Sequence, residues 1–161
     1  MNESSLDRVA AFISIHQLDA EILPTPKGVP TVESAAAALG VAADQIIKTL
    51  VFIGPQHHLV IAIASGTARV DRKKIAAAAG LVSVRFASPE LVLASTGYPA
   101  GGVAPIGLPE EVPVIIDDRV LTYDEVYGGA GNDLHMMRIR SADLITLNQA
   151  IVTSIIQDIV A

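Results

Sequence analysis

The chain has 161 residues, the size of a typical domain, and we expect residues 1–161 to form a single one. About half of the residues (51%) are hydrophobic and only 17% are charged, which excludes a disordered chain. The absence of cysteine excludes disulfides, thiolate catalysis and iron–sulfur clusters. No apolar run approaches the roughly 20 residues of a membrane-spanning helix, and the N-terminus lacks the pattern of a secretory signal. We therefore expect a cytoplasmic protein.

The formal net charge is −6, from 17 acidic and 11 basic residues. A protein that binds nucleic acid along an extended groove carries a basic face, because phosphate neutralisation supplies much of the affinity. Here the longest basic run is Arg72-Lys73-Lys74, and three tyrosines and three phenylalanines are too few for a base-stacking platform. We therefore expect no DNA partner, whereas contact with one end of a nucleic acid stays open.

Apolar periodicity and turn residues predict alternating helices and strands. The first predicted helix begins at Ser4 or Ser5, and the predicted N-caps of the other four are Thr31, Asp71, Ser88 and Ser141. The predicted strands are Glu21–Leu23, Ile47–Ile53, Leu59–Ala64, Val82–Phe86, Val112–Asp117 and Leu134–Ile139, and Ile151–Ala161 closes the chain as a strand or a helix. One hairpin, between the second and third strands, interrupts the βαβ rhythm. We therefore expect an α/β fold with one mixed, curved sheet of about six or seven strands and helices packed against it.

Several common catalytic signatures are missing from the sequence. It has no phosphate-binding Gly-x-x-x-x-Gly-Lys-Ser/Thr, no Gly-x-Gly-x-x-Gly, no His-Glu-x-x-His and no Gly-x-Ser-x-Gly. His57 and His58 are adjacent, as are Asp117 and Asp118, and neighbours on an extended chain point to opposite sides. We interpret the first pair as a solvated hairpin loop and the second as a turn after a strand. We expect no metal and no cofactor.

Lys48 is the first candidate functional residue. It is one of four lysines, and in the stretch Ile46–Ile53 every other residue except Thr49 is apolar. On a strand, Lys48 shares a face with Leu50 and Phe52, which leaves little room for a fully solvated ammonium. The side chain either reaches water along its own stem, or is a partly enclosed charge that holds a carboxylate, a phosphate or a developing oxyanion.

The second candidate is the loop from Gly97 to Pro109, which holds four glycines and three prolines. Glycine permits a positive φ and a close approach of backbone to ligand, and proline stiffens the chain. Such a loop can aim backbone N–H groups at a carbonyl oxygen or a phosphate. A plain connection is the alternative, although about 13 residues without regular structure favour a function.

Four segments together resemble the YbaK/ProX group, which contains Cys-tRNA(Pro) deacylase-like trans-editing proteins and the editing domain of bacterial prolyl-tRNA synthetases. The segments are Gln45–Phe52, Ala64-Ser65-Gly66 with Val70-Asp71 and Lys74, the G-x-x-x-P loop at Gly101 and Pro105, and Gly128–Gly131 followed by Ser141–Leu144. They follow the family's order and spacing from about Thr31 to Ala150, with Ser141 where proline is usual.

The resemblance implies a YbaK/ProX-like fold and an aminoacyl-tRNA deacylase that acts in trans. Such proteins hydrolyse the ester between a wrong amino acid and the terminal adenosine of tRNA, and the substrate's own ribose hydroxyl helps to activate water. Lys48 is then expected to anchor the terminal nucleotide or the ester, and the Gly101 N–H to bind the developing oxyanion.

The resemblance also implies further site residues and partners. We expect the substrate-binding residues Gly102, Pro105, Ser65, Gly66 and Thr31, of which Gly102 and Pro105 hold the loop's shape. The expected partners are the 3′ end of mischarged tRNA and a synthetase such as prolyl-tRNA synthetase, without a membrane. Cys, Ala, Ser, Pro and Thr esters all stay open, because one methylene group discriminates by only roughly 1–3 kcal/mol.

Two other functions would use the same residues. One is a non-catalytic module that binds a tRNA end or a synthetase without turnover. The other is an esterase that acts on small activated acyl compounds and needs no RNA. The lysine and the glycine loop do not separate these alternatives from a deacylase.

Overall fold

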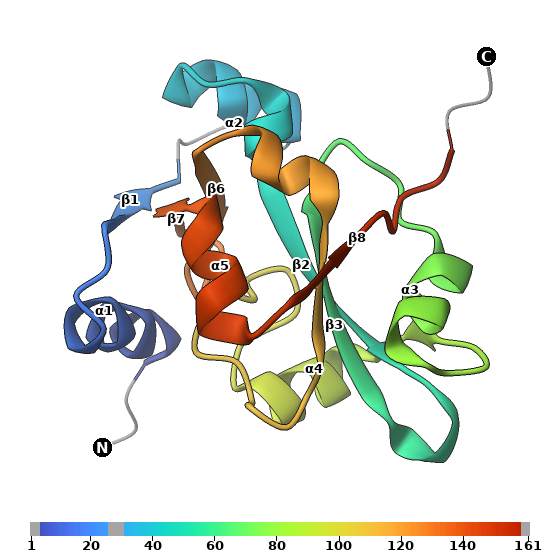
Figure 1. The fold of residues 1–161 in the computed structure, drawn as a ribbon. Coiled ribbons are helices and arrows are strands. Elements are labelled where there is room, and N and C mark those ends of the chain that lie inside the picture. The colour runs from blue at the N-terminus through green and yellow to red at the C-terminus, as the bar shows by residue number, and fades with distance from the viewer. Residues whose placement is uncertain (1–3, 26–30, 159–161) are drawn as a thin grey trace.

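The computed structural model describes residues 4–25 and 31–158, in which helices pack on two β-sheets (Figure 1). The eight strands of these ranges are β1 (Ala20–Pro24), β2 (Ile47–Ile53), β3 (Leu59–Ser65), β4 (Arg85–Phe86), β5 (Val114–Asp117), β6 (Glu125–Gly129), β7 (His135–Arg140) and β8 (Ile151–Thr153). One sheet has the order β1-β7-β6, and the other has the order β4-β2-β3-β5-β8. Within the described ranges, no helix has the length and apolarity needed to cross a membrane.

The expected mixed α/β architecture is confirmed, but its strands divide into two sheets instead of one. In the larger sheet, β2 pairs antiparallel with β3, and β5 pairs parallel with β3 and β8. The strand that sequence patterns missed is β6, where Gly128 and Gly129 hide the pattern because glycine weakens strand propensity. β6 also touches the start of β2 through a bridge between Tyr127 and Ile46, so the two sheets meet there.

The helices are α1 (Ser5–Ile15), α2 (Val32–Leu39), α3 (Arg72–Ala79), α4 (Pro89–Thr96) and α5 (Ser141–Asn148). In three of them the predicted N-cap side chain accepts a first-turn N–H, at Thr31, Asp71 and Ser88. The expectation that Ser141 caps the last helix is wrong. Arg140 occupies the N-cap position of α5, and the Ser141 hydroxyl donates instead to the Tyr123 carbonyl at 2.6 Å.

Several predicted strands are shorter than expected, because pairing partners fix where a strand ends. The stretch Val82–Phe86 contributes only β4, whose two residues pair with the end of β2. The stretch Val112–Asp117 contributes only β5, and Leu134–Ile139 shifts by one residue to become β7. Of the closing segment Ile151–Ala161, the first three residues form β8, and residues 159–161 lie outside the described ranges.

The larger sheet carries a hydrophobic core on each face. The larger core contains Val9 of α1, Val92 of α4 and Leu144 of α5, and the smaller core contains Ile75 of α3. Accordingly, α1 and α3 lie at opposite sides of the molecule, with β2 and β3 between them (Figure 1). Side chains at the start of β2 therefore point alternately towards the two cores, and the candidate site lies at this end of the strand.

Candidate functional site

Lys48 is the second residue of β2, on the side of the strand that faces the smaller core. Its neighbour Ile47 belongs to the larger core, whereas Phe52, four residues further along β2, belongs to the smaller one. The Lys48 Nζ donates to the Ala68 carbonyl oxygen at 2.5 Å. Burial lowers the pKa of Lys48 below its ordinary value of 10.5. Lys48 is thus a partly enclosed cation that retains further N–H donors for a ligand.

The turn that follows β3 lies beside this lysine. The Gly66 N–H donates to the Ile46 carbonyl at 2.7 Å, which ties the turn to the start of β2. A Cβ at Gly66 would lie 3.0 Å from a methyl group of Val32 in α2, so the space is too tight for a larger residue. The structure therefore brings Lys48 and Gly66 together with Ser65 and the first turn of α2.

Thr31, the residue before α2, has a structural task of its own. Its hydroxyl accepts the Ser34 N–H at 3.0 Å, and the Ser34 hydroxyl is 3.1 Å from the Thr31 N–H. This reciprocal capping box satisfies two backbone donors at the helix start. The helix start is near Gly66 and Lys48, but the Thr31 hydroxyl is already engaged.

The tip of the glycine loop is a tight turn. The Gly102 N–H donates to the Pro99 carbonyl at 3.0 Å, so residues 99–102 form a β-turn with Gly101 at its third position. Gly101 has φ +85°, a conformation that favours glycine, and a Cβ there would meet no atom within 4 Å. Gly101 is exposed at the tip, with open space in front of it.

Residues 102–106 of the loop are buried and contact three other segments. The Gly102 carbonyl accepts the Gly131 N–H at 2.9 Å, and the Pro105 carbonyl accepts the Asn148 amide of α5 at 2.9 Å. β6 packs so closely that a Cβ at Gly129 would lie 2.5 Å from the Val103 carbonyl oxygen. Gly102 and Pro105 are therefore anchored to neighbouring segments, and their role in holding the shape of the loop for a substrate stays a prediction.

The lysine and the loop lie at the same end of β2, but they approach it from opposite faces. A Cβ at Gly128 would lie 3.1 Å from Ile47 and 3.5 Å from Pro105, so the loop packs beside Ile47. Lys48, one residue further, turns towards Ala68 instead. Strand alternation alone predicts this separation, yet the sequence pattern did not show which face the loop covers.

Sequence reasoning missed one polar group beside the loop. His135, the first residue of β7, has its Nδ1 3.0 Å from the Asn132 side-chain oxygen. The backbone of Asn132 lies 3.1 Å from where a Cβ of Gly102 would be. The signal available in the sequence was a lone histidine just after the glycine-rich turn Gly128–Gly131.

On the lysine side, a small cavity of about 140 Å³ is lined by residues that include Ala68, Ser65 and Asp117. Asp117 is fully buried, and its carboxylate accepts the N–H of Ile155 at 2.9 Å and of Arg119 at 3.3 Å. The expected turn after a strand is thus present at Asp117. Within residues 4–25 and 31–158, no group of three or more acidic or histidine side chains is placed to hold a metal ion.

The chain matches a known protein family over most of its length. The family model for the aminoacyl-tRNA editing domain matches residues 26–147. The chain belongs to this family. The match spans β2, β3 and the whole Gly101 loop, and it leaves α1 outside.

Individual relatives agree with this placement. EbsC of Enterococcus faecalis, named as a candidate Cys-tRNA(Pro)/Cys-tRNA(Cys) deacylase, is 34% identical over 99 residues, 62% of this chain and 60% of EbsC. YwhH of Bacillus subtilis is 35% identical over 63% of this chain and 64% of its own length. The chain thus matches less than two thirds of the length of these two relatives. A proline–tRNA ligase of Nitratidesulfovibrio vulgaris is 34% identical over 73% of this chain and 20% of the ligase.

Solved structures show the same fold. The crystal structure of a candidate trans-editing enzyme for prolyl tRNA synthetase superposes with a TM-score of 0.85 at 29% identity, covering 98% of this chain and all of the other. A protein described as hypothetical protein APE2540 gives a TM-score of 0.83 at 30% identity, over 93% of this chain and 99% of the other. The YbaK-like fold expected from the sequence is confirmed.

Proposed function

We propose that the protein is an aminoacyl-tRNA deacylase that acts in trans on mischarged tRNA. The observation that carries the proposal is Lys48, a half-buried ammonium held by a backbone carbonyl within a matched editing domain. Burial strengthens the attraction of this cation for a phosphate or an ester oxygen, because the local dielectric is lower than that of water. Lys48 anchors the terminal nucleotide or the ester end of the substrate.

The Gly101 N–H supplies the second interaction. It lies in the exposed turn at the tip of the loop, where no atom lies within 4 Å of the position of a Cβ. Water adds to the ester carbonyl, and the N–H stabilises the negative charge that develops on the carbonyl oxygen. The acyl–oxygen bond then breaks, and the ribose oxygen leaves with a proton. The ribose hydroxyl next to the ester helps to activate the water, and the protein contributes position and charge.

The substrate class is inferred from the relatives. EbsC is named for cysteinyl-tRNA, and the other relative is a proline–tRNA ligase, so we place the substrate among small amino acids such as Cys, Ala, Ser and Pro. Ser65, Gly66 and Thr31, at the lysine side, contact the nucleotide end, and Gly102 and Pro105 support the acyl end. Because the chain carries a net charge of −6, only the acceptor end of the tRNA enters, with prolyl-tRNA synthetase as the partner that holds the rest.

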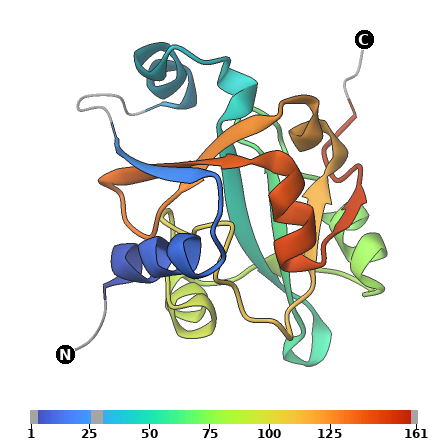
Figure 2. The same ribbon diagram turned by 60° about the vertical axis from the view of Figure 1, so that its left-hand side comes forward.

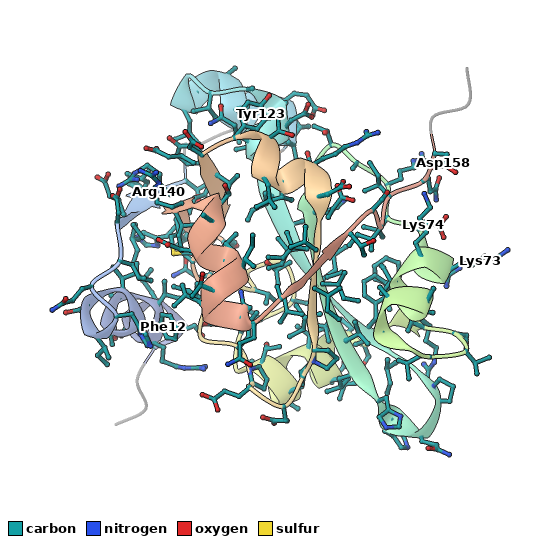
Figure 3. The ribbon with its side chains drawn as sticks, in the orientation of Figure 1. Phe12, Lys73, Lys74, Tyr123, Arg140 and Asp158 are labelled. Atoms are coloured by element: carbon teal, nitrogen blue, oxygen red, sulfur yellow. The ribbon has the colours of Figure 1, made fainter. Side chains whose placement is uncertain are left out.

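The test is deacylation of tRNA mischarged with Cys, Ala, Ser, Pro or Thr. We expect wild type to hydrolyse at least one of these esters and Lys48→Ala to lose on the order of 10²–10³-fold in rate. The matched control is Lys73→Ala, which removes the same charge from the exposed surface of α3 (Figure 3). Lys74 is unsuitable because its Nζ lies 2.8 Å from Asp158.

Two outcomes would contradict the proposal. Binding of the tRNA end without turnover by wild type assigns the protein to the non-catalytic modules. Hydrolysis of a small activated ester such as p-nitrophenyl acetate, with none of the five aminoacyl-tRNAs, assigns it to the esterases.

A further inference from the structure

Tyr98 closes the glycine loop from inside the larger core. It is fully buried, and its hydroxyl donates to the Ile106 carbonyl at 2.8 Å. Residues 98 and 106 stand on either side of a segment that contains both the turn with Gly101 and Pro105 of the G-x-x-x-P motif. One side chain therefore links the two ends of the loop, across eight residues of sequence.

The hydroxyl group is specifically accommodated. Gly107 has φ +66°, and a Cβ there would lie 2.6 Å from the Tyr98 oxygen. At the other end, the Tyr98 N–H donates to the Thr96 hydroxyl at 3.0 Å. A buried hydroxyl without an acceptor is unfavourable, so the phenol and the Ile106 carbonyl hold each other in place.

Helix α1, which lies outside the matched family segment, contacts Tyr98 and the start of the loop. The Arg8 guanidinium carbon lies 5.0 Å from the centre of the Tyr98 ring, within the range of a cation–π interaction. The Ser5 hydroxyl donates to the Gly97 carbonyl at 3.2 Å. These contacts place α1 next to the C-terminal end of α4, the helix that leads into the loop (Figure 2).

The tip of the loop has no comparable support of its own. A Cβ at Gly101 would meet nothing within 4 Å, whereas Gly102 and the following four residues are buried. The direction in which the Gly101 N–H points is therefore set by the anchored residues on either side of the turn. On the N-terminal side, the anchor is Tyr98.

We propose that Tyr98, backed by Arg8 of α1, is a positioning residue that fixes the direction of the Gly101 N–H. This inference rests on the proposed function, since it assigns that N–H to the ester carbonyl. Tyr98 touches no substrate atom and acts only through the loop. A misdirected donor still lets the tRNA end bind at Lys48, but it stabilises the oxyanion less well.

The test compares Tyr98→Phe with Ser141→Ala. Each variant removes one buried hydroxyl that donates to a backbone carbonyl, and Ser141, at the start of α5, donates to Tyr123, which lies outside the loop. We expect Tyr98→Phe to lower kcat on the order of 10–100-fold with KM unchanged. Ser141→Ala should leave both near wild type, with a similar loss of melting temperature. Arg8→Met, which keeps the stem but removes the charge, should lower kcat by a smaller factor.

Hydrogen exchange provides a readout that does not depend on activity. In Tyr98→Phe, the amides of residues 102–104 should exchange faster while those of β2 and β3 keep their protection. Uniformly faster exchange, or a kcat loss equal to that of Ser141→Ala, would show a merely structural tyrosine and overturn the inference. If wild type deacylates nothing, the proposed function fails, whereas unchanged loop exchange in Tyr98→Phe refutes the positioning role alone.

Discussion

The two halves of the candidate site, the lysine on β2 and the Gly101 loop, differ in which part of the chain faces the proposed substrate. On the lysine side, β2 is a regular strand, and the proposed mechanism uses one side chain, whose ammonium is partly withdrawn from water. On the loop side, the proposed mechanism uses a backbone N–H, and side chains hold the loop in place. A substitution on the lysine side should therefore lower activity with little loss of stability, whereas a substitution in the loop should lower both.

The largest expected effect is at Lys48. Lys48→Met keeps the length of the side chain but removes a charge whose burial opposes folding. We expect deacylation to fall on the order of 10²–10³-fold, while the melting temperature stays equal or rises. Calorimetry together with the deacylation assay checks this. A large drop in melting temperature would mean that the bond to Ala68 is structural and that the comparison is wrong.

The next effect is at the loop tip, where the chain offers a matched control. Gly101 and Gly80 have φ +85° and +72°, and a Cβ at either would meet no atom within 4 Å. Alanine at each should therefore lower the free energy of unfolding by about 1–2 kcal/mol, through backbone strain alone. Only Gly101→Ala should also lower kcat, by about 10-fold or more, because the strain turns the N–H. Equal activity of the two variants would remove the oxyanion role from Gly101.

The smallest effect concerns pH. Because burial lowers the pKa of Lys48, the folded protein loses this proton at a lower pH than the unfolded chain, whose lysine titrates near 10.5. The unfolded state binds more protons in that window, so this group makes stability rise with pH there. Affinity for tRNA with an amide-linked, non-hydrolysable amino acid should instead fall in the same window, as the cation is lost. The measurement is a binding titration across that range.

Lys48→Arg is the control for this pH dependence. Arginine stays charged throughout the range, so binding by this variant should not fall as pH rises. Its affinity at neutral pH should still be lower than that of wild type, because a planar guanidinium does not replace a compact ammonium. A wild-type titration that matches the arginine variant would show that Lys48 does not contact the bound end.

The sequence was sufficient to predict features that depend on interactions between residues close together in the chain. The N-caps at Thr31, Asp71 and Ser88 are confirmed because a hydroxyl or carboxylate next to an exposed N–H acts within one turn. The bounds of β2 are confirmed because apolar β-branched residues fill the strand and Gly54 ends it. The glycine that the tip of the loop requires, Gly101, was likewise visible in the sequence.

Tertiary structure decided everything that depends on pairing between distant segments. β6 exists because Gly128 and Gly129 leave room for Val103 and Ile47, which no periodicity in residues 125–129 reveals. Packing likewise buries Tyr98 against Ile106 and places His135 near Gly102. The sequence by itself thus singled out Lys48 and Gly101 as candidate residues, since lysine and glycine have distinct local properties. The faces of β2 beside which they lie were decided by long-range packing, because strand alternation is local but the element that covers each face is not.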